Sequence, residues 1–144
     1  MDELNNALRE ALADTFVMYF KAHSFHWNVE GPDFQQYHSF LNDLYEELHD
    51  AVDTIAEHIR AIDYYAPTSL TSLLDNTKIN QQAGLKPAVE MLKDLSSDNN
   101  VVLASLYVAY QLAEENTELG LSNFLQDRID VHQKHGWMLK AITK

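Results

Sequence analysis

The sequence contains no cysteine and few residues that interrupt helices. Without cysteine the chain cannot form disulfides, thiolate metal sites or a thiol nucleophile, which suits a reducing compartment. Only 4 Gly and 3 Pro occur among 144 residues. Because these residues most often end helices, their scarcity beside abundant Leu, Ala, Glu and Asp favours long helices with few connections. The composition therefore predicts an all-α fold.

The sequence also lacks any targeting or membrane-spanning pattern. Its first ten residues have neither a basic start nor an apolar core, and no apolar run approaches the roughly 18 residues needed to cross a bilayer. We therefore expect a cytoplasmic protein without a membrane partner. Basic residues are scarce as well, because 10 Lys and Arg stand against 22 Asp and Glu, a net charge of −12. This charge repels nucleic-acid phosphates and favours cations, although an acidic surface also simply keeps a protein soluble.

Two long helices are predicted in the first half of the chain. Apolar residues recur at steps of three and four over 4–28, the period of an amphipathic helix. Gly31 and Pro32 break the pattern, and Asp33 is placed to cap a second helix over 34–65. Along that helix Leu, Val and Ile form one stripe, and carboxylates form another on roughly the opposite side: Asp43, Glu46, Asp50, Asp53 and Glu57.

The second half predicts a crossover followed by two more helices. Residues 66–84 are rich in turn formers around an apolar patch, which indicates a connection with one short helix. A third long helix begins near Pro87, and its polar stretch 96–100 is expected to weaken or divide it. A fourth helix covers 121–143. Four long helices with one long crossover form a ferritin-like bundle, and we expect residues 1–144 to be a single domain.

Histidines and carboxylates gather in the first two helices. His23 and His26 lie one turn apart, and the turn at 28–33 folds His38 back toward His26. Asp53 and Glu57 are spaced i, i+4, so that both carboxylates face one way. Imidazole and carboxylate together are a ligand set for first-row metals. The alternatives are core histidines satisfied by hydrogen bonds and a carboxylate stripe that is simply solvated.

One spacing motif of di-iron proteins is incomplete in this sequence. Di-iron sites inside a single four-helix bundle use two Glu-x-x-His motifs on different helices, plus a Glu from each of the other two helices. The chain has only one such motif, Glu46 to His49. A site of that kind therefore cannot be assembled within one chain, and any iron site must be built differently.

The same stretch resembles the Dps family, the ferritin-like mini-shells named as DNA-binding proteins from starved cells. The resemblance rests on His26-Trp27-Asn28, on Gly31 and Phe34, on His38 twelve residues after His26, and on Asp53-x-x-x-Glu57. The closing segment HQKHGWML at 132–139 agrees with it, so the resemblance spans nearly the whole chain.

The resemblance implies a hollow homo-dodecamer that oxidises Fe(II), with hydrogen peroxide as preferred oxidant, and stores ferric mineral. Its ferroxidase sites are shared across two-fold axes, so His26 and His38 would come from one subunit, and Asp53 and Glu57 from its neighbour. Trp27 would intercept radicals or pack as an aromatic. Iron is the implied metal, with zinc as a competing occupant. Carboxylates on the second helix are candidates for nucleating mineral: Glu46, Glu47 and Asp50. The alternative is a shell of the same fold with little ferroxidase activity that acts by assembly or by binding DNA or another partner.

The sequence departs from the family pattern at three places. Asn42 stands where many members carry an acidic residue, which predicts weaker binding of a second iron. Gly120 and Asn123 fall where many members have the aspartates of the iron entry pore, and the carboxylates that could substitute there, or be merely solvated, are Glu114, Glu115 and Glu118. No basic terminal arm is present, so we expect no direct DNA binding.

Overall fold

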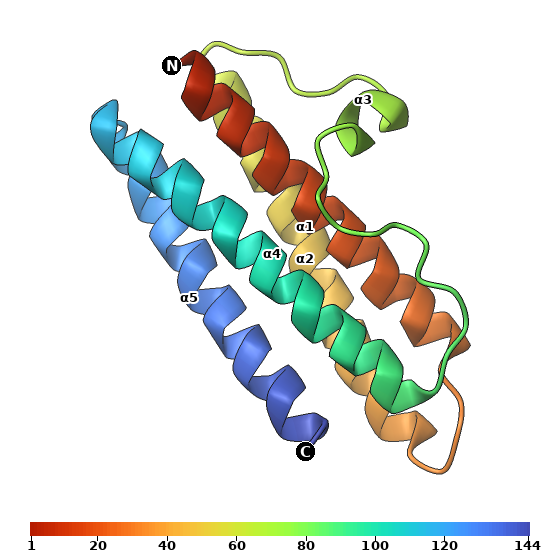
Figure 1. The fold of residues 1–144 in the computed structure, drawn as a ribbon. Coiled ribbons are helices and arrows are strands. Elements are labelled where there is room, and N and C mark those ends of the chain that lie inside the picture. The colour runs from red at the N-terminus through yellow and green to blue at the C-terminus, as the bar shows by residue number, and fades with distance from the viewer.

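The computed structural model describes residues 1–144 as five helices without strands (Figure 1). The helices are α1 (Asp2–Asn28), α2 (Phe34–Ala61), α3 (Leu70–Leu74), α4 (Ala88–Glu115) and α5 (Leu119–Ile142). The all-α prediction and the short helix within the crossover are thereby confirmed. None of the five helices combines the length and the hydropathy needed for a membrane span.

The four long helices lie side by side as a bundle (Figure 1). α1 packs against both α2 and α4, and α4 packs against α5. α2 returns antiparallel to α1, and the segment that carries α3 then runs the length of the bundle, so that α4 starts beside the turn between α1 and α2. This single long crossover is what the sequence predicts for a ferritin-like bundle.

The core is formed by apolar stripes that the helical period predicts. The side chains that α2 buries are Leu41, Leu44, Leu48, Ala51, Ile55 and Ile59. They meet fully buried residues of the other long helices, such as Leu8, Leu95 and Leu125. The carboxylates of the predicted stripe on the opposite side of α2 are exposed: Asp43, Glu46, Asp50, Asp53 and Glu57.

α2 ends four residues earlier than the sequence predicts. Asp63 adopts φ 72°, a left-handed conformation that stops the helix. Its N–H donates to the Arg60 carbonyl and the N–H of Tyr64 donates to the Ile59 carbonyl, which is the Schellman arrangement. This position is usually glycine or asparagine, whereas here it is an aspartate. Neither the residue type nor the apolar spacing therefore indicates where the helix ends.

α4 is continuous, and the expectation that residues 96–100 divide it is wrong. Two polar side chains of this stretch, Asp98 and Asn99, are buried and have partners on other helices. Asp98 pairs with the buried Lys21 of α1 at 2.7 Å, and the Asn99 Nδ2 donates to the His132 carbonyl of α5 at 2.8 Å. These tertiary contacts outweigh the weak helix propensity of Asp and Asn.

One buried carboxylate holds the crossover against the bundle. Asp14 of α1 is fully buried and accepts hydrogen bonds from the Thr77 hydroxyl at 2.8 Å, from the Lys78 N–H at 2.8 Å and from the Ser105 hydroxyl of α4 at 2.6 Å. A buried carboxylate is stabilised when several donors bind it. If the carboxylate were removed, these donors would be buried without an acceptor.

Replacing Asp14 with alanine should therefore lower the free energy of unfolding by about 2–4 kcal/mol, because the three donors lose their acceptor. Urea unfolding at a fixed subunit concentration measures it. The matched control is Glu10→Ala, one turn earlier on α1, which removes only an exposed ion pair with Lys78 and should cost less than about 1 kcal/mol. Equal costs for the two variants would show that Asp14 does not anchor the crossover.

Candidate metal centre

His26 and His38 form a stacked pair where α1 ends and α2 begins. Their ring centroids lie 3.7 Å apart with the planes 15° from parallel. The Nδ1 of His26 lies 2.8 Å from the His38 carbonyl, and the Nδ1 of His38 lies 2.8 Å from the His26 carbonyl. A carbonyl only accepts, so each Nδ1 must carry the proton. In the neutral ring this tautomer leaves the Nε2 lone pair free, the state in which histidine binds a metal.

The turn between the helices fixes this pair. Gly31 has φ 121°, which a residue with a side chain rarely adopts, and the Phe34 N–H closes the turn on its carbonyl. Val29 is buried and holds the connection to the core. The Phe34 ring stacks on His38, with centroids 4.9 Å apart. A ligand pair locked in this way loses little conformational freedom when a metal binds.

Asp53 and Glu57 do not lie near the two histidines. Both carboxylates are exposed on α2 and have no hydrogen bond or ion pair within the chain. Fifteen residues of helix separate His38 from Asp53, which amounts to about 22 Å. No group of three or more His, Asp or Glu side chains in the chain is arranged to hold a metal ion. The predicted ligands thus form two separate halves.

Aromatic side chains continue from the histidine pair along α1. Trp27 is 58% exposed, and its ring lies 4.2 Å from that of His23. His23 stacks on Tyr45 of α2 at 3.8 Å, and its Nδ1 lies 3.0 Å from the Tyr19 hydroxyl. Burial, followed by the neighbouring charges of His26 and His49, lowers the pKa of His23. His23 is thus a hydrogen-bonded packing residue, and its i, i+4 spacing from Tyr19 is the sequence signal for this role.

The carboxylates considered for mineral nucleation or iron entry differ in their exposure and in whether they have a partner within the chain. Glu46 and Asp50 are exposed on α2 and border a hollow of about 340 Å³. Glu114 accepts a hydrogen bond from Ser122, so that its carboxylate is engaged within the chain. Asn42 is half-buried one turn after His38. Gly120 and Asn123 are exposed near the start of α5. Glu115, at the end of α4, is also exposed, and Glu118 is half-buried.

Glu47 belongs to a network that joins α2 to α5. Its carboxylate accepts hydrogen bonds from both Nη atoms of Arg128 and, at 2.8 Å, from the His135 Nε2. Burial alone would raise the pKa of Glu47, but the hydrogen bonds from His135 and Arg128 and their charges outweigh it and hold this pKa at about 2. The carboxylate is therefore already neutralised, and we leave Glu47 out of the set proposed to nucleate mineral.

The network continues to a histidine at the centre of the bundle. His132 is fully buried, its Nε2 accepts from Arg128 at 2.9 Å, and its Nδ1–H donates to the Asn99 Oδ1 at 2.7 Å. Burial, reinforced by the charge of Arg128, lowers the pKa of His132 well below its ordinary value. His132 is thus a neutral structural residue that ties α5 to α4.

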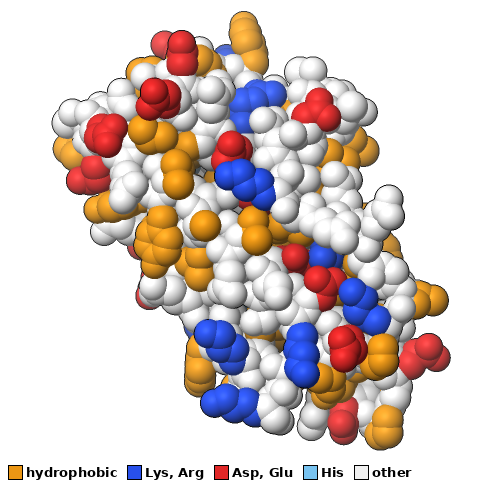
Figure 2. Space-filling model, in the orientation of Figure 1, with side chains coloured by type: hydrophobic (Ala, Val, Ile, Leu, Met, Phe, Trp, Pro, Cys, Tyr) orange, Lys and Arg blue, Asp and Glu red, His pale blue; other side chains and the backbone are white.

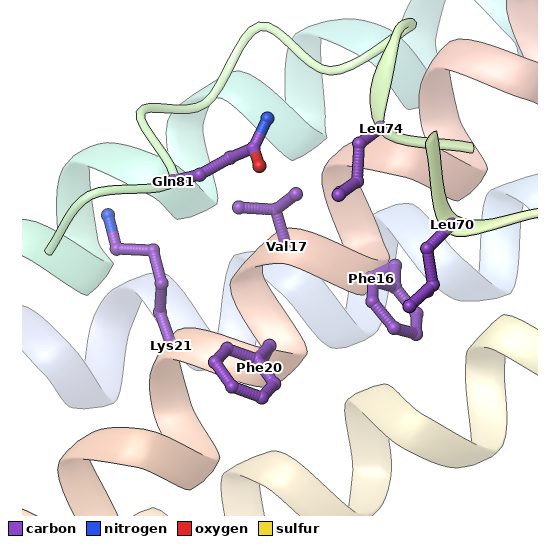
Figure 3. A pocket seen from close by; sticks show the side chains of 7 residues that line it. All are labelled: Phe16, Val17, Phe20, Lys21, Leu70, Leu74 and Gln81. Carbon is purple, nitrogen blue, oxygen red and sulfur yellow. The ribbon is translucent and has the colours of Figure 1, made fainter. Parts of the chain in front are cut away.

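An apolar hollow of about 280 Å³ opens between α1 and the crossover (Figure 3). Phe16, Val17 and Phe20 of α1 face Leu70 and Leu74 of α3 across it, and Lys21 and Gln81 border it. Phe20 is 51% and Leu70 64% exposed. The Phe20 ring lies 6.4 Å from that of Trp27, so the exposed apolar surface continues to Trp27, the residue that follows His26.

Comparisons with known sequences cover nearly the whole chain. The family model for the ferritin-like domain matches residues 5–144. The chain is 33% identical over 138 residues to a DNA protection during starvation protein of Brevibacillus brevis, with 95% of this chain and 92% of that protein covered. It is 30% identical over 143 residues to general stress protein 20U of Bacillus subtilis, with 97% of each covered.

Solved structures show the same fold. A Dps protein from Bacillus brevis superposes with a TM-score of 0.92 at 30% identity, covering 98% of this chain and 95% of that chain. A Dps from Vibrio cholerae, described as a member of a broad superfamily of ferritin-like diiron-carboxylate proteins, gives 0.94 at 26% identity, covering 99% and 90%. The chain belongs to the Dps family of ferritin-like proteins.

Proposed function

We propose that twelve copies of this chain form a hollow shell that oxidises Fe(II) with hydrogen peroxide and stores the ferric product. The observation that carries this proposal is the division of the ligands into two halves. His26 and His38 present two free Nε2 atoms on a rigid turn. Asp53 and Glu57, which have no partners of their own, lie about 22 Å and about 28 Å from His38 along α2. Each half is incomplete, and a second subunit would supply the other.

A two-fold contact along α2 would join the halves. In such a contact each subunit uses the same surface, so one antiparallel pair of α2 helices creates two identical sites. Exposed apolar side chains on α1 and α3 support burial of this part of the surface against a neighbour: Phe20, Trp27 and Leu70. A monomer seldom exposes so much contiguous apolar surface without a binding function.

The proposed donor set suits iron oxidation. Two neutral imidazoles hold Fe(II) against water, and two carboxylates favour the higher charge of Fe(III). When one peroxide takes one electron from each of two Fe(II), its O–O bond breaks and two hydroxides form, which take up protons to become water. Hydroxyl radical is not released in this balance. Trp27, which follows His26 in the sequence, would intercept a single-electron oxidant that escapes, in addition to packing against His23.

Storage inside the shell would use the free carboxylates of α2. Glu46 and Asp50 are exposed and unpaired, which is what binding of ferric ions requires. Zinc, which accepts the same imidazole and carboxylate ligands, would compete for the oxidation site. Direct binding of DNA is not part of the proposal, because the net charge is −12 and acidic, basic and apolar side chains are mixed over the face seen in Figure 2.

Oxidation kinetics of the intact protein test the function. Anaerobic protein loaded with Fe(II) should turn over rapidly when peroxide is added, with one peroxide consumed for two Fe(II) and little hydroxyl radical caught by a spin trap. Native mass spectrometry of the same sample should give a dodecamer. Oxidation no faster than in buffer, or a monomer as the native species, would contradict the proposal.

A further inference from the structure

His49 is a histidine that the chain itself leaves unused. Of the 7 histidines, His23, His26, His38, His132 and His135 have hydrogen-bond partners within the chain. His49 has none, and its exposed ring lies against Tyr19, with centroids 4.9 Å apart. It borders the hollow of about 340 Å³ on α2 together with Glu46 and Asp50. Both of its ring nitrogens are therefore available.

His49 lies on the same helix ridge as the two carboxylates. His49, Asp53 and Glu57 follow one another at steps of four residues. Each step advances about 6 Å along the helix and rotates only about 40° around it, so the three side chains form one row. His38 and Asn42 form a second row with the same spacing, nearer the start of α2.

A two-fold contact places the ends of these two rows opposite each other. In the proposed site Asp53 of the partner subunit lies beside His38. Along α2, the next residue on the same face one turn from His38, in the direction of the two-fold axis, is Asn42. Because the helices run antiparallel, one turn toward the axis from Asp53 of the partner subunit reaches His49 of the partner subunit. In that arrangement Asn42 would face a free imidazole from the neighbouring chain.

We propose that His49 of the partner subunit binds the second metal ion of each shared site, next to Asn42. This inference rests on the proposed two-fold site. A neutral amide is a weak ligand and brings no charge, so a second ion held between Asn42 and solvent alone would be poorly bound. An imidazole is a strong ligand for Fe(II), Co(II) and Zn(II), and a poor one for Ca²⁺ and Mg²⁺. The second position would consequently select borderline divalent metals.

Titration with Co(II) tests this, because cobalt binds without turnover and its visible spectrum reports nitrogen ligands. The parent shell should bind two Co(II) for each shared site. His49→Gln, and His49→Phe, which keeps the ring against Tyr19, should bind the first ion as the parent does and the second about tenfold or more weakly, with loss of part of the visible absorption. Adding Asn42→Asp to His49→Gln should restore the second ion with a spectrum richer in oxygen ligands.

The matched control is His58→Gln. His58 is the other histidine without a hydrogen bond, but it lies about 180° around α2 from His49 and packs on Phe124 of α5, 4.5 Å away. It should bind both ions like the parent.

Unchanged binding of two Co(II) by assembled His49 variants would overturn the proposal, as would failure of both His49 variants to assemble while His58→Gln assembles, because His49 would then be a packing residue. An Asp53→Ala, Glu57→Ala variant that loses all Co(II) binding would support the shared site, whatever the His49 variants show. Parent-like binding by that variant would instead remove the proposed function.

Discussion

The Asp53→Ala, Glu57→Ala double variant is expected to oxidise Fe(II) at least about a hundredfold more slowly than the parent when peroxide is added. Loss of two ligands removes the charge that stabilises Fe(III). For comparison, removal of one oxyanion-hole donor from an enzyme costs about 3 kcal/mol in the barrier. Stopped-flow absorbance of the ferric product measures the rate. The fold should survive, because both carboxylates are exposed and without partners in the chain.

A matched control separates site chemistry from charge. Glu90→Ala with Asp130→Ala also removes two exposed carboxylates without partners, on α4 and α5, and leaves α2 untouched. This control should oxidise Fe(II) at the parent rate. If the two double variants were slowed equally, the loss would reflect general attraction of cations to an acidic protein, and the assignment of Asp53 and Glu57 would be wrong.

The second large effect concerns stability, through Glu47. Glu47→Gln leaves the buried Arg128 without its anion. A fall in pKa from 4.5 to about 2 corresponds to about 3 kcal/mol at full strength. Because a third of the Glu47 side chain is exposed, solvent screening reduces this, and we expect the free energy of unfolding to fall by about 2 kcal/mol at pH 7. Asp43→Asn, one turn earlier and exposed, should change it by less than about 0.5 kcal/mol.

The same variant should change the response to acid. The pKa of Glu47 is lower in the folded chain than in the unfolded one, so its contribution is complete above pH 4.5 and is lost as the pH falls toward 2. Glu47→Gln should therefore lose less stability than the parent over this range. The lowered pKa of His132 acts in both proteins, with stability lost as the pH falls below 6.5. Parallel stability curves for the two proteins between pH 4.5 and 2 would contradict the role given to Glu47.

The architecture can be predicted from spacing, but helix ends and polar partners cannot. The apolar period of α2 identifies Leu41, Leu44 and Leu48 as core residues, because burial follows the helical repeat. The end of α2 does not follow from this period, since it depends on the left-handed backbone of Asp63. The continuity of α4 does not follow from it either, because Asp98 is satisfied by Lys21, which is 77 residues away in the sequence.

The candidate site likewise has features that the sequence predicts and features that it does not. The turn predicts that His38 returns to His26, and the structure places the two rings in contact. The exchange of Nδ1 hydrogen bonds with each other's carbonyls depends on the detailed path of the turn, which a residue pattern does not specify. The partners of Glu47 could not be predicted either, since Arg128 and His135 lie on a different helix. The roles of His26, His38, Asp53 and Glu57 as ligands remain predictions.

The central claim, a site shared between two subunits, is tested most directly by mixing two inactive variants. His26→Ala, His38→Ala chains keep the carboxylates, and Asp53→Ala, Glu57→Ala chains keep the histidines. The two chains are co-expressed with different tags and isolated as mixed shells. With random pairing half of the dimers contain both chains, and each of these has one intact site of two, so about a quarter of the parent activity should return. Mixed shells with no more activity than either variant alone would show that the histidines and carboxylates do not meet between subunits.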